Sequence, residues 1–246
     1  MGKIIAIYGA PGSGKTTIAC NLAYALSKKM TTGVLQTNIY YASIQHFFGM
    51  EIKKSKDLST ALLGYGKEDL SKCFTPHPQN NNLYILSPSN TYDCLALADD
   101  KNGLDGETAK NIILELKDMF DYLIVDCTPD INDALAIYSL INSEKIVNII
   151  KPNIQGMAFA TSYQSLFTAL EFSDKKIIHV INNDKNYIGI TTIQKILNVP
   201  SSLCIPHHKD AETAENTGIP LYTYNNKFTT SINTIIDVII GGTEIE

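Results

Sequence analysis

The segment that most constrains the fold is a glycine-rich turn near the start of the chain, which reads Gly9-Ala-Pro-Gly-Ser-Gly-Lys-Thr-Thr17. An apolar, β-branched run at Lys3–Tyr8 precedes it, and apolar residues at three- and four-residue spacing follow it. The turn satisfies the pattern G-x-x-x-x-G-K-[ST] in the strand, loop and helix context of a phosphate-binding loop. We therefore expect an α/β sheet whose first strand leads into an anion-binding helix N-terminus.

Each part of this turn has a chemical role. Gly12 and Gly14 let the backbone curl so that amide groups point at phosphates, although Pro11 donates no N–H. Lys15 can reach the β- and γ-phosphates, and the Thr16 hydroxyl can bind Mg²⁺. A glycine-rich turn without a ligand is the alternative interpretation, and the flanking strand and helix patterns count against it.

Short β-branched runs alternate with helical patterns along the chain, which predicts an α/β fold with a single doubly wound, mostly parallel sheet and helices on both faces. We expect strands at Lys3–Tyr8, Gly33–Asn38, Asn82–Ser87, Tyr122–Asp126, Lys145–Ile150, Lys175–Asn182 and Ser202–Ile205. We expect helices at about 15–29, 107–119, 131–142, 155–171, 190–197, 209–217 and 229–240. Phe74–Asn82 and Asp99–Gly106 are interpreted as surface loops. Residues 1–246 show no repeat or linker and are interpreted as one P-loop NTPase domain.

A second candidate element is the run Phe120-Asp-Tyr-Leu-Ile-Val-Asp126-Cys-Thr-Pro129, an apolar strand that ends in a carboxylate. The carboxyl ends of parallel strands form the edge at which α/β sheets bind ligands. Asp126 is therefore expected to hold a water of the Mg²⁺ shell or the catalytic water. The alternative is an Asp that caps a helix or lies at the surface after a buried strand.

The charged residues exclude several classes of function. The chain has 20 basic and 25 acidic residues, and all 20 basic residues are lysines. Without arginine there is no arginine finger and no Arg-rich lid of the adenylate-kinase type, which disfavours a small-molecule kinase. A net charge of −5 and dispersed lysine pairs at 28–29, 53–54 and 175–176 disfavour non-specific DNA binding.

Cysteine spacing and apolar run length bear on the compartment. The five cysteines are scattered and form no Cys-x-x-Cys pair, which fits a reduced cytoplasmic protein. The apolar runs Tyr122–Val125 and Ile235–Ile240 are far shorter than the roughly 18 to 20 residues that cross a bilayer. The C-terminal residues 241–246 are acidic, so we expect a last helix that covers the sheet and no autonomous membrane anchor.

Beyond the glycine-rich turn, the order of motifs resembles a known family. Asp121-Tyr-Leu-Ile-Val-Asp-Cys-Thr-Pro-Asp-Ile-Asn-Asp133 is similar to the "DxxIIDxPP" element of ParA/MinD-type deviant Walker-A ATPases. The segments KKIIHVINN and IQKILNVPSSLCIPHHKDAETAENTGIPL follow in the order seen in this family, particularly in its CpaE/TadZ pilus-assembly branch. The resemblance covers nearly the whole chain, although no single C-terminal segment is specific.

The resemblance implies a set of nucleotide contacts. It assigns phosphate and Mg²⁺ binding to the loop residues and places Asp126 in switch II; the loop residues are Gly9, Gly12, Ser13, Gly14, Lys15, Thr16 and Thr17. Asn182 would hydrogen-bond the adenine edge, with Pro206 and His207 beside the base. An amide can both donate to and accept from adenine, but a strand-end Asn in a turn is also common. Metal binding by the adjacent His207 and His208 is not favoured, because neighbouring strand residues cannot both face one ion.

Two departures from the family pattern concern hydrolysis. The family's signature lysine, which crosses the dimer interface, is replaced by Ala10, and the switch-I pattern Asp-x-Asp is replaced by Asn38 and Tyr40. An amide and a phenol cannot act as a carboxylate at neutral pH. We therefore expect hydrolysis to be slow or to depend on a partner, while nucleotide binding is retained. Lys151 could supply the missing charge.

Taken together, the sequence predicts an ATP/ADP- and Mg²⁺-binding switch ATPase that forms a nucleotide-dependent homodimer. It would position or recruit a partner assembly of the pilus, secretion, plasmid-partition or conjugation type. A hydrolysis-deficient nucleotide-binding scaffold is the main alternative, and a small-molecule kinase is a weaker one.

Overall fold

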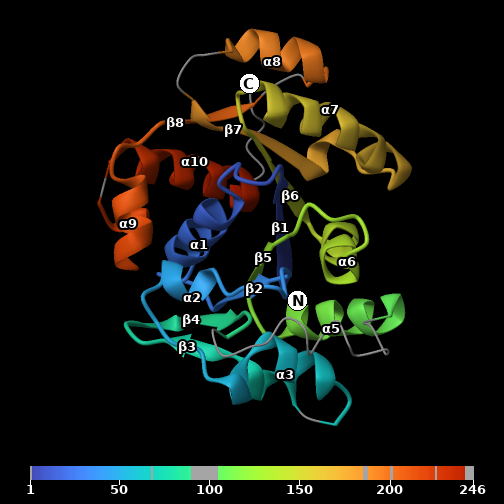
Figure 1. Cartoon of the computed structure of the whole chain (residues 1–246), viewed down its shortest axis with the longest axis vertical. Coiled ribbons are helices and arrows are strands. Elements are labelled where there is room, and N and C mark those ends of the chain that lie inside the picture. The colour runs from blue at the N-terminus through green and yellow to red at the C-terminus, as the bar shows by residue number, and fades with distance from the viewer. Residues whose placement is uncertain are drawn as a thin grey trace.

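The computed structural model describes residues 2–67, 69–89, 105–184, 188–199, 202–224 and 226–241. Eight strands form one sheet in the order β3-β4-β2-β5-β1-β6-β7-β8, and every neighbouring pair is parallel except β3 and β4 (Figure 1). The strands are β1 (Lys3–Gly9), β2 (Thr32–Gln36), β3 (Thr75–His77), β4 (Asn80–Leu86), β5 (Tyr122–Asp126), β6 (Lys145–Ile150), β7 (Ile177–Asp184) and β8 (Leu203–Pro206). The predicted α/β fold with one mostly parallel sheet is confirmed.

Helices cover both faces of this sheet. They are α1 (Lys15–Leu26), α2 (Ile44–Phe47), α3 (Leu58–Leu63), α5 (Gly106–Asp118), α6 (Ala134–Asn142), α7 (Ile154–Ala169), α8 (Ile190–Leu197), α9 (Ala211–Thr217) and α10 (Lys227–Gly241). Short 3₁₀ turns lie at Lys54–Lys56, Leu70–Cys73, Asp174–Lys176 and Leu221–Tyr224. Within the described ranges, no helix is both long and apolar enough to cross a membrane.

The side-chain alternation of the central strand explains the two helical layers. On β1, Ile5 and Ile7 pack into one buried cluster together with α1 and α10, while Ile4, Ala6 and Tyr8 pack into a second cluster with α5 and α6. Successive strand residues point to opposite faces, so a strand buried on both faces is apolar throughout. Figure 1 shows α1 and α10 on one side of the strands and α5, α6 and α7 on the other.

The strand order places a binding crevice at the end of β1. From β1 the chain crosses to β2 on one side, whereas β6, β7 and β8 lie on the other side. Ligands in open α/β sheets bind outside the carboxyl ends of the strands at such a reversal of strand order. The glycine-rich turn after β1 and the Asp126 end of β5, which pairs with β1, therefore share this edge.

The interpretation of Phe74–Asn82 as a surface loop is wrong. Thr75–His77 and Asn80–Leu86 form an antiparallel pair, and Phe74 and His77 are buried. Ring contacts between Phe74 and Phe120, and between His77 and Phe48, hold this edge strand in place. Because the strand has only three residues, it shows no alternating pattern from which it could be predicted. Most of the other loop interpretation, Asp99–Gly106, lies outside the described residues.

Most predicted boundaries are within a few residues, but two helices were missed. β2 ends at Gln36 and leaves Asn38 outside the strand, because the segment that follows bonds to the Gln36 side chain. The helices α2 and α3 were not predicted, since at four and six residues they are shorter than the periodicity that identifies a helix.

Candidate nucleotide site

The turn between β1 and α1 has the backbone of an anion-binding loop. Gly12 and Gly14 have φ angles of 65° and 91°, which other residues rarely adopt, and Gly14 is the N-cap of α1. A Cβ on Gly14 would lie 2.2 Å from the Asn182 Nδ2 atom, so the position requires glycine for space as well. The first helical residue is Lys15, as predicted, and the free amides of this helix end face the edge of the sheet.

Lys15, Thr16 and Asp126 form the polar centre of the site. The Thr16 hydroxyl donates to Asp126 Oδ2 at 2.6 Å, and Lys15 Nζ donates to the Ala10 carbonyl at 3.0 Å. Burial raises the pKa of Asp126 to about 6, against the opposing effects of the Thr16 hydrogen bond and the Lys15 charge. Burial also lowers the pKa of Lys15, and the charge of Asp126 opposes that change. In this poorly solvated site, the charge of each residue therefore favours the ionised form of the other.

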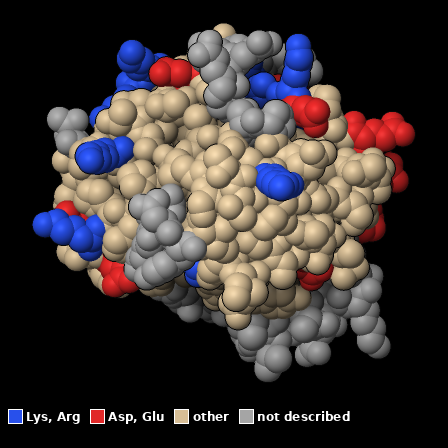
Figure 2. All heavy atoms as spheres, turned by 90° about the horizontal axis from the view of Figure 1, so that it is seen from above, with Lys and Arg blue, Asp and Glu red and all other residues tan. Residues whose placement is uncertain are grey.

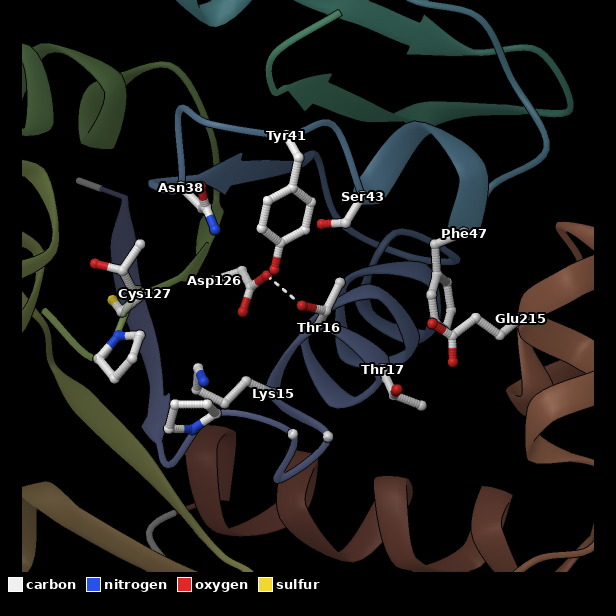
Figure 3. A pocket seen from close by; sticks show the side chains of 15 residues that line it. Lys15, Thr16, Thr17, Asn38, Tyr41, Ser43, Phe47, Asp126, Cys127 and Glu215 are labelled. Carbon is white, nitrogen blue, oxygen red and sulfur yellow. Dashed lines mark hydrogen bonds between the residues drawn. The ribbon is translucent and has the colours of Figure 1, made fainter. Parts of the chain in front are cut away.

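A pocket of about 550 Å³ opens above this centre (Figure 3). It is lined by Pro11, Gly12, Gly14, Lys15, Thr16, Thr17, Asn38, Tyr41, Ser43, Phe47, Asp126, Cys127, Thr128, Pro129 and Glu215. In Figure 3 the Tyr41 ring points into the pocket toward Thr16 and Asp126, while Phe47 and Glu215 lie at the opposite side near Thr17. The predicted loop residues and Asp126 are thus brought together, whereas Gly9 and Ser13 do not line this pocket.

The segment after β2 is held by one buried side chain, Gln36. Its Nε2 donates to the Asn38 and Tyr41 carbonyls at 2.9 and 2.6 Å. Its Oε1 accepts from both the amide and the hydroxyl of Ser43 and from the Ile44 amide, at 3.1 to 3.2 Å. Gln36 therefore sets the path that presents Asn38 and Tyr41 to the pocket.

Tyr40 is not where the sequence placed it. It lines a neighbouring pocket that Asn38 also lines, but not the pocket that contains Lys15, Thr16 and Asp126. The physical reason is the Gln36-bound turn, in which the Tyr40 amide donates to Asn38 Oδ1 at 2.9 Å. Asn38 is thus the switch-I candidate at the phosphates, and Tyr41 is its neighbour in the pocket.

A second set of hydrogen bonds ties the segment after β5 to the segment after β2. The Thr128 amide donates to Thr37 Oγ1 at 2.9 Å, and the Thr128 hydroxyl donates to Asp133 Oδ2 at 2.7 Å. Asp133 also caps α6 by accepting from the Ala136 amide. Burial raises the pKa of Asp133, and these hydrogen bonds oppose the rise.

A second pocket of about 430 Å³ lies on the other side of the loop. It shares Gly12, Gly14 and Thr17 with the first pocket and is completed by Ser13, Lys151, Asn182, Ile205, Pro206, His207, His208, Lys209, Ala211, Glu212 and Phe228. Asn182 Nδ2 donates to the Ser13 carbonyl at 2.7 Å. The three residues predicted beside adenine, Asn182, Pro206 and His207, are therefore brought together next to the loop.

The donor set at Thr16 and Asp126 fits Mg²⁺. Asp126 Oδ1 is buried and has no hydrogen-bond partner among the described residues, and it stands beside the Thr16 hydroxyl that Oδ2 engages. Magnesium takes few protein oxygens and completes its octahedron with water and substrate phosphates. In the part of the chain that the structure describes, no group of three His, Cys, Asp or Glu residues is placed to hold a metal. A magnesium ion would thus depend on these two residues and on phosphate.

Several pocket residues were not predicted from sequence. They are Thr37, Tyr41, Ser43, Phe47, Thr128, Asp133 and Glu215, and Gln36, which holds the segment after β2, was not predicted either. A Gln at the end of an otherwise apolar strand was the available signal for the loop that follows β2. Glu215 reaches the site only through the packing of α9 near α2, which no local pattern reveals.

Comparison with known proteins agrees with this geometry. The family model described as "AAA domain" (AAA_31) matches residues 2–171. The septum site-determining protein MinD of Thermotoga maritima is 27% identical over 230 residues, which cover 90% of this chain and 81% of that protein.

Two solved structures share the fold. MinD of Pyrococcus horikoshii, complexed with Mg-ADP, has a TM-score of 0.79 at 21% identity, and the match covers 98% of this chain and 96% of the MinD chain. A ParA family ATPase of Chlorobium tepidum has a TM-score of 0.79 at 18% identity, and the match covers 94% of this chain and 96% of that chain. With a family model matched over residues 2–171 and a phosphate loop facing Asp126, the chain belongs to the AAA domain family and is similar to P-loop ATPases of the ParA/MinD type.

Proposed function

We propose that this protein binds ATP and ADP with Mg²⁺ and works as a switch ATPase whose turnover is slow or depends on a partner. The observation that carries the proposal is the junction of two pockets, of about 550 and 430 Å³, at one glycine-rich loop. One contains Lys15, Thr16 and Asp126, and the other contains Asn182, Pro206 and His207. This division suits a ligand with a charged phosphate end and a flat, polar base.

The phosphates would lie on the loop amides from Gly12 to Thr17, with Lys15 at the β- and γ-phosphates. Mg²⁺ would take the Thr16 hydroxyl and a water held by Asp126. In the second pocket the base would pack on Pro206 and His207. Because Asn182 Nδ2 donates to the Ser13 carbonyl, its Oδ1 is the atom offered to the adenine amine. The relative from Pyrococcus horikoshii was solved with Mg-ADP, which supports this ligand class.

Slow hydrolysis is proposed from the groups that face the phosphate end. Among the described residues that line the first pocket, the carboxylates are Asp126 and Glu215, and Glu215 lies across the pocket from Asp126 in Figure 3. The segment after β2 contributes Asn38, Tyr41 and Ser43, which carry no charge to orient a water. The chain has no arginine to stabilise the transition state.

The assembly, domain extent and cellular role are parts of the same proposal. Residues 1–246 would act as one domain that forms a nucleotide-dependent homodimer in the cytoplasm and recruits or positions a protein assembly. Figure 2 shows a face that is mostly uncharged, with acidic residues among the lysines at its rim, which supports our expectation that DNA is disfavoured as a partner. Within the ParA/MinD group, the C-terminal motif order favours the CpaE/TadZ branch.

The direct test is nucleotide binding by the purified protein. We expect wild type to bind ATP and ADP with Mg²⁺, Lys15→Ala to abolish binding, and Thr16→Ala to remove mainly the Mg²⁺-dependent part. Lys110→Ala, an exposed site on α5 outside both pockets, is the matched control. Equal thermal shifts with nucleotide for wild type and Lys15→Ala would overturn the proposal.

A hydrolysis-deficient scaffold is the second candidate, favoured by Ala10 and by the uncharged Asn38 and Tyr41 at the phosphates. Single-turnover phosphate release with excess protein separates it from a slow ATPase. A rate that exceeds buffer hydrolysis and disappears in Lys15→Ala supports the ATPase, whereas no release over hours supports the scaffold. Transfer of phosphate to an added nucleotide or small molecule would instead indicate a kinase.

A further inference from the structure

Lys151 occupies a rigid position at the edge of the phosphate loop. It directly follows β6, and its carbonyl accepts from the Asn153 amide at 2.8 Å. Asn153 then caps α7 by accepting from the Gly156 amide. A Cβ on Gly156 would lie 2.3 Å from the Lys151 carbonyl oxygen and 2.8 Å from its Cβ, so the glycine lets α7 pack against this residue. The backbone that carries Lys151 is therefore defined by its neighbours.

The ammonium of Lys151 lies against the loop itself. Its Nζ atom is 3.8 Å from the point at which a Cβ on Gly12 would stand, and the side chain lines the second pocket beside Gly12, Ser13 and Gly14. The ion pairs among the described residues are Lys117–Glu144 and His208–Asp210. Lys151 is thus a partly buried cation at the loop without a described carboxylate partner.

The charge balance of the site favours a ligand role over a solvated surface lysine. The Lys15 ammonium donates to the Ala10 carbonyl and is coupled to Asp126, so part of its charge is already balanced. Lys209, the other lysine of the second pocket, is exposed near Glu212. A polyphosphate on this loop would therefore meet, besides Lys15, the Lys151 ammonium, whose charge no described carboxylate balances.

We propose that Lys151 binds the nucleotide phosphates within its own protomer and supplies from the β6–α7 connection the positive charge that Ala10 lacks. The inference rests on the proposed function, because it assigns a residue to the same nucleotide site. It predicts a contribution that increases with the number of phosphates on the ligand, whereas a purely structural lysine would affect AMP, ADP and ATP equally.

The experiment measures dissociation constants of Mg-ATP, ADP and AMP for wild type, Lys151→Gln, Lys151→Arg and the exposed control Lys110→Gln. Losing one charged hydrogen bond at a partly buried site is expected to weaken ATP binding about tenfold or more, and AMP binding by less than about twofold. Lys151→Arg should retain most of the affinity, and raising the salt concentration should reduce the difference between wild type and Lys151→Gln. The urea midpoints of the nucleotide-free proteins should agree.

The outcomes separate this inference from the proposed function. If wild type binds no nucleotide, the proposed function is wrong, and the inference that rests on it is wrong as well. If wild type binds and Lys15→Ala does not, but Lys151→Gln matches wild type, the inference alone is wrong. The measurements are made at concentrations where light scattering reports monomer. A loss that appears only in the dimer would show that Lys151 acts across the interface, which would overturn the assignment to its own protomer.

Discussion

Replacing Asp126 with Asn should stabilise the nucleotide-free protein, because the fold buries this carboxylate at a cost. The pKa of Asp126 is raised from 3.8 to about 6 by burial, which means that the folded state favours the neutral acid. A raised acid pKa contributes stability that is present below the unfolded value and is lost as the pH rises through the folded value. For Asp126 the loss therefore runs from about pH 4 to above pH 6.

The magnitude follows from the two pKa values. From 3.8 and about 6, the ionised carboxylate costs the fold about 3 kcal/mol at pH 8 and about 1.5 kcal/mol at pH 5. Asn keeps an oxygen that can accept from the Thr16 hydroxyl, so the replacement removes the charge and keeps the hydrogen bond. Asp126→Asn should therefore raise the free energy of unfolding by up to these amounts, with the larger gain at pH 8.

Urea unfolding at pH 5 and pH 8, in buffer with a metal chelator and no nucleotide, measures both differences. Glu51→Gln, at an exposed carboxylate, is the control and should change the free energy by less than about 0.5 kcal/mol at either pH. Asp126→Asn, unlike this control, should also lose Mg²⁺-dependent nucleotide binding. A variant no more stable than wild type at pH 8, or an equal gain at both pH values, would refute the reasoning.

Three further predictions concern the loop and the segment after β2. Gly14→Ala should weaken nucleotide binding about 10- to 100-fold in titration, because a Cβ at φ 91° would stand 2.2 Å from Asn182 Nδ2; an unchanged affinity would contradict the geometry. Gln36→Leu should lower the free energy of unfolding by about 2 to 4 kcal/mol in urea, since it leaves the buried Ile44 amide and the partly buried Asn38 and Tyr41 bonds without their partner, and a loss below about 1 kcal/mol would count against it. Asn38→Asp should raise single-turnover phosphate release more than Tyr40→Asp does, because Asn38 lines the phosphate pocket and Tyr40 does not; the reverse order would show that our placement is wrong.

The fold and the phosphate loop could be predicted because their signals are local. The pattern from Gly9 to Thr17 specifies the loop backbone directly, and Tyr122–Asp126 is an apolar run whose observed bounds equal the predicted ones. Long, strongly patterned elements such as α10 have the same advantage. In each case one short window of sequence contains both the apolar period and the residue that ends the element.

The segment after β2 could not be predicted because distant atoms decide its path. Tyr40 was assigned to the phosphates by counting residues from the strand, but the Gln36 side chain bonds to four later residues and turns the chain so that Tyr41 faces the pocket instead. The edge strand Thr75–His77 failed for a similar reason. It is held by ring contacts to Phe120 and Phe48, which lie far away in sequence.

The site is connected in a way that suits a switch more than a fast catalyst. The Asp126 side chain lines the pocket beside Lys15 and Thr16, while its carbonyl accepts from the Thr37 amide at 3.1 Å. The Thr37 hydroxyl in turn accepts from the Thr128 amide, so the segments after β2 and β5 are joined directly beside Asp126. A change in charge at Asp126, as on loss of Mg²⁺ and phosphate, therefore acts on both segments at once. Among the described residues after β2 that line the pocket, Asn38, Tyr41 and Ser43 carry no charge to orient a water. We therefore propose a long-lived ATP state whose end is set by whatever binds these segments.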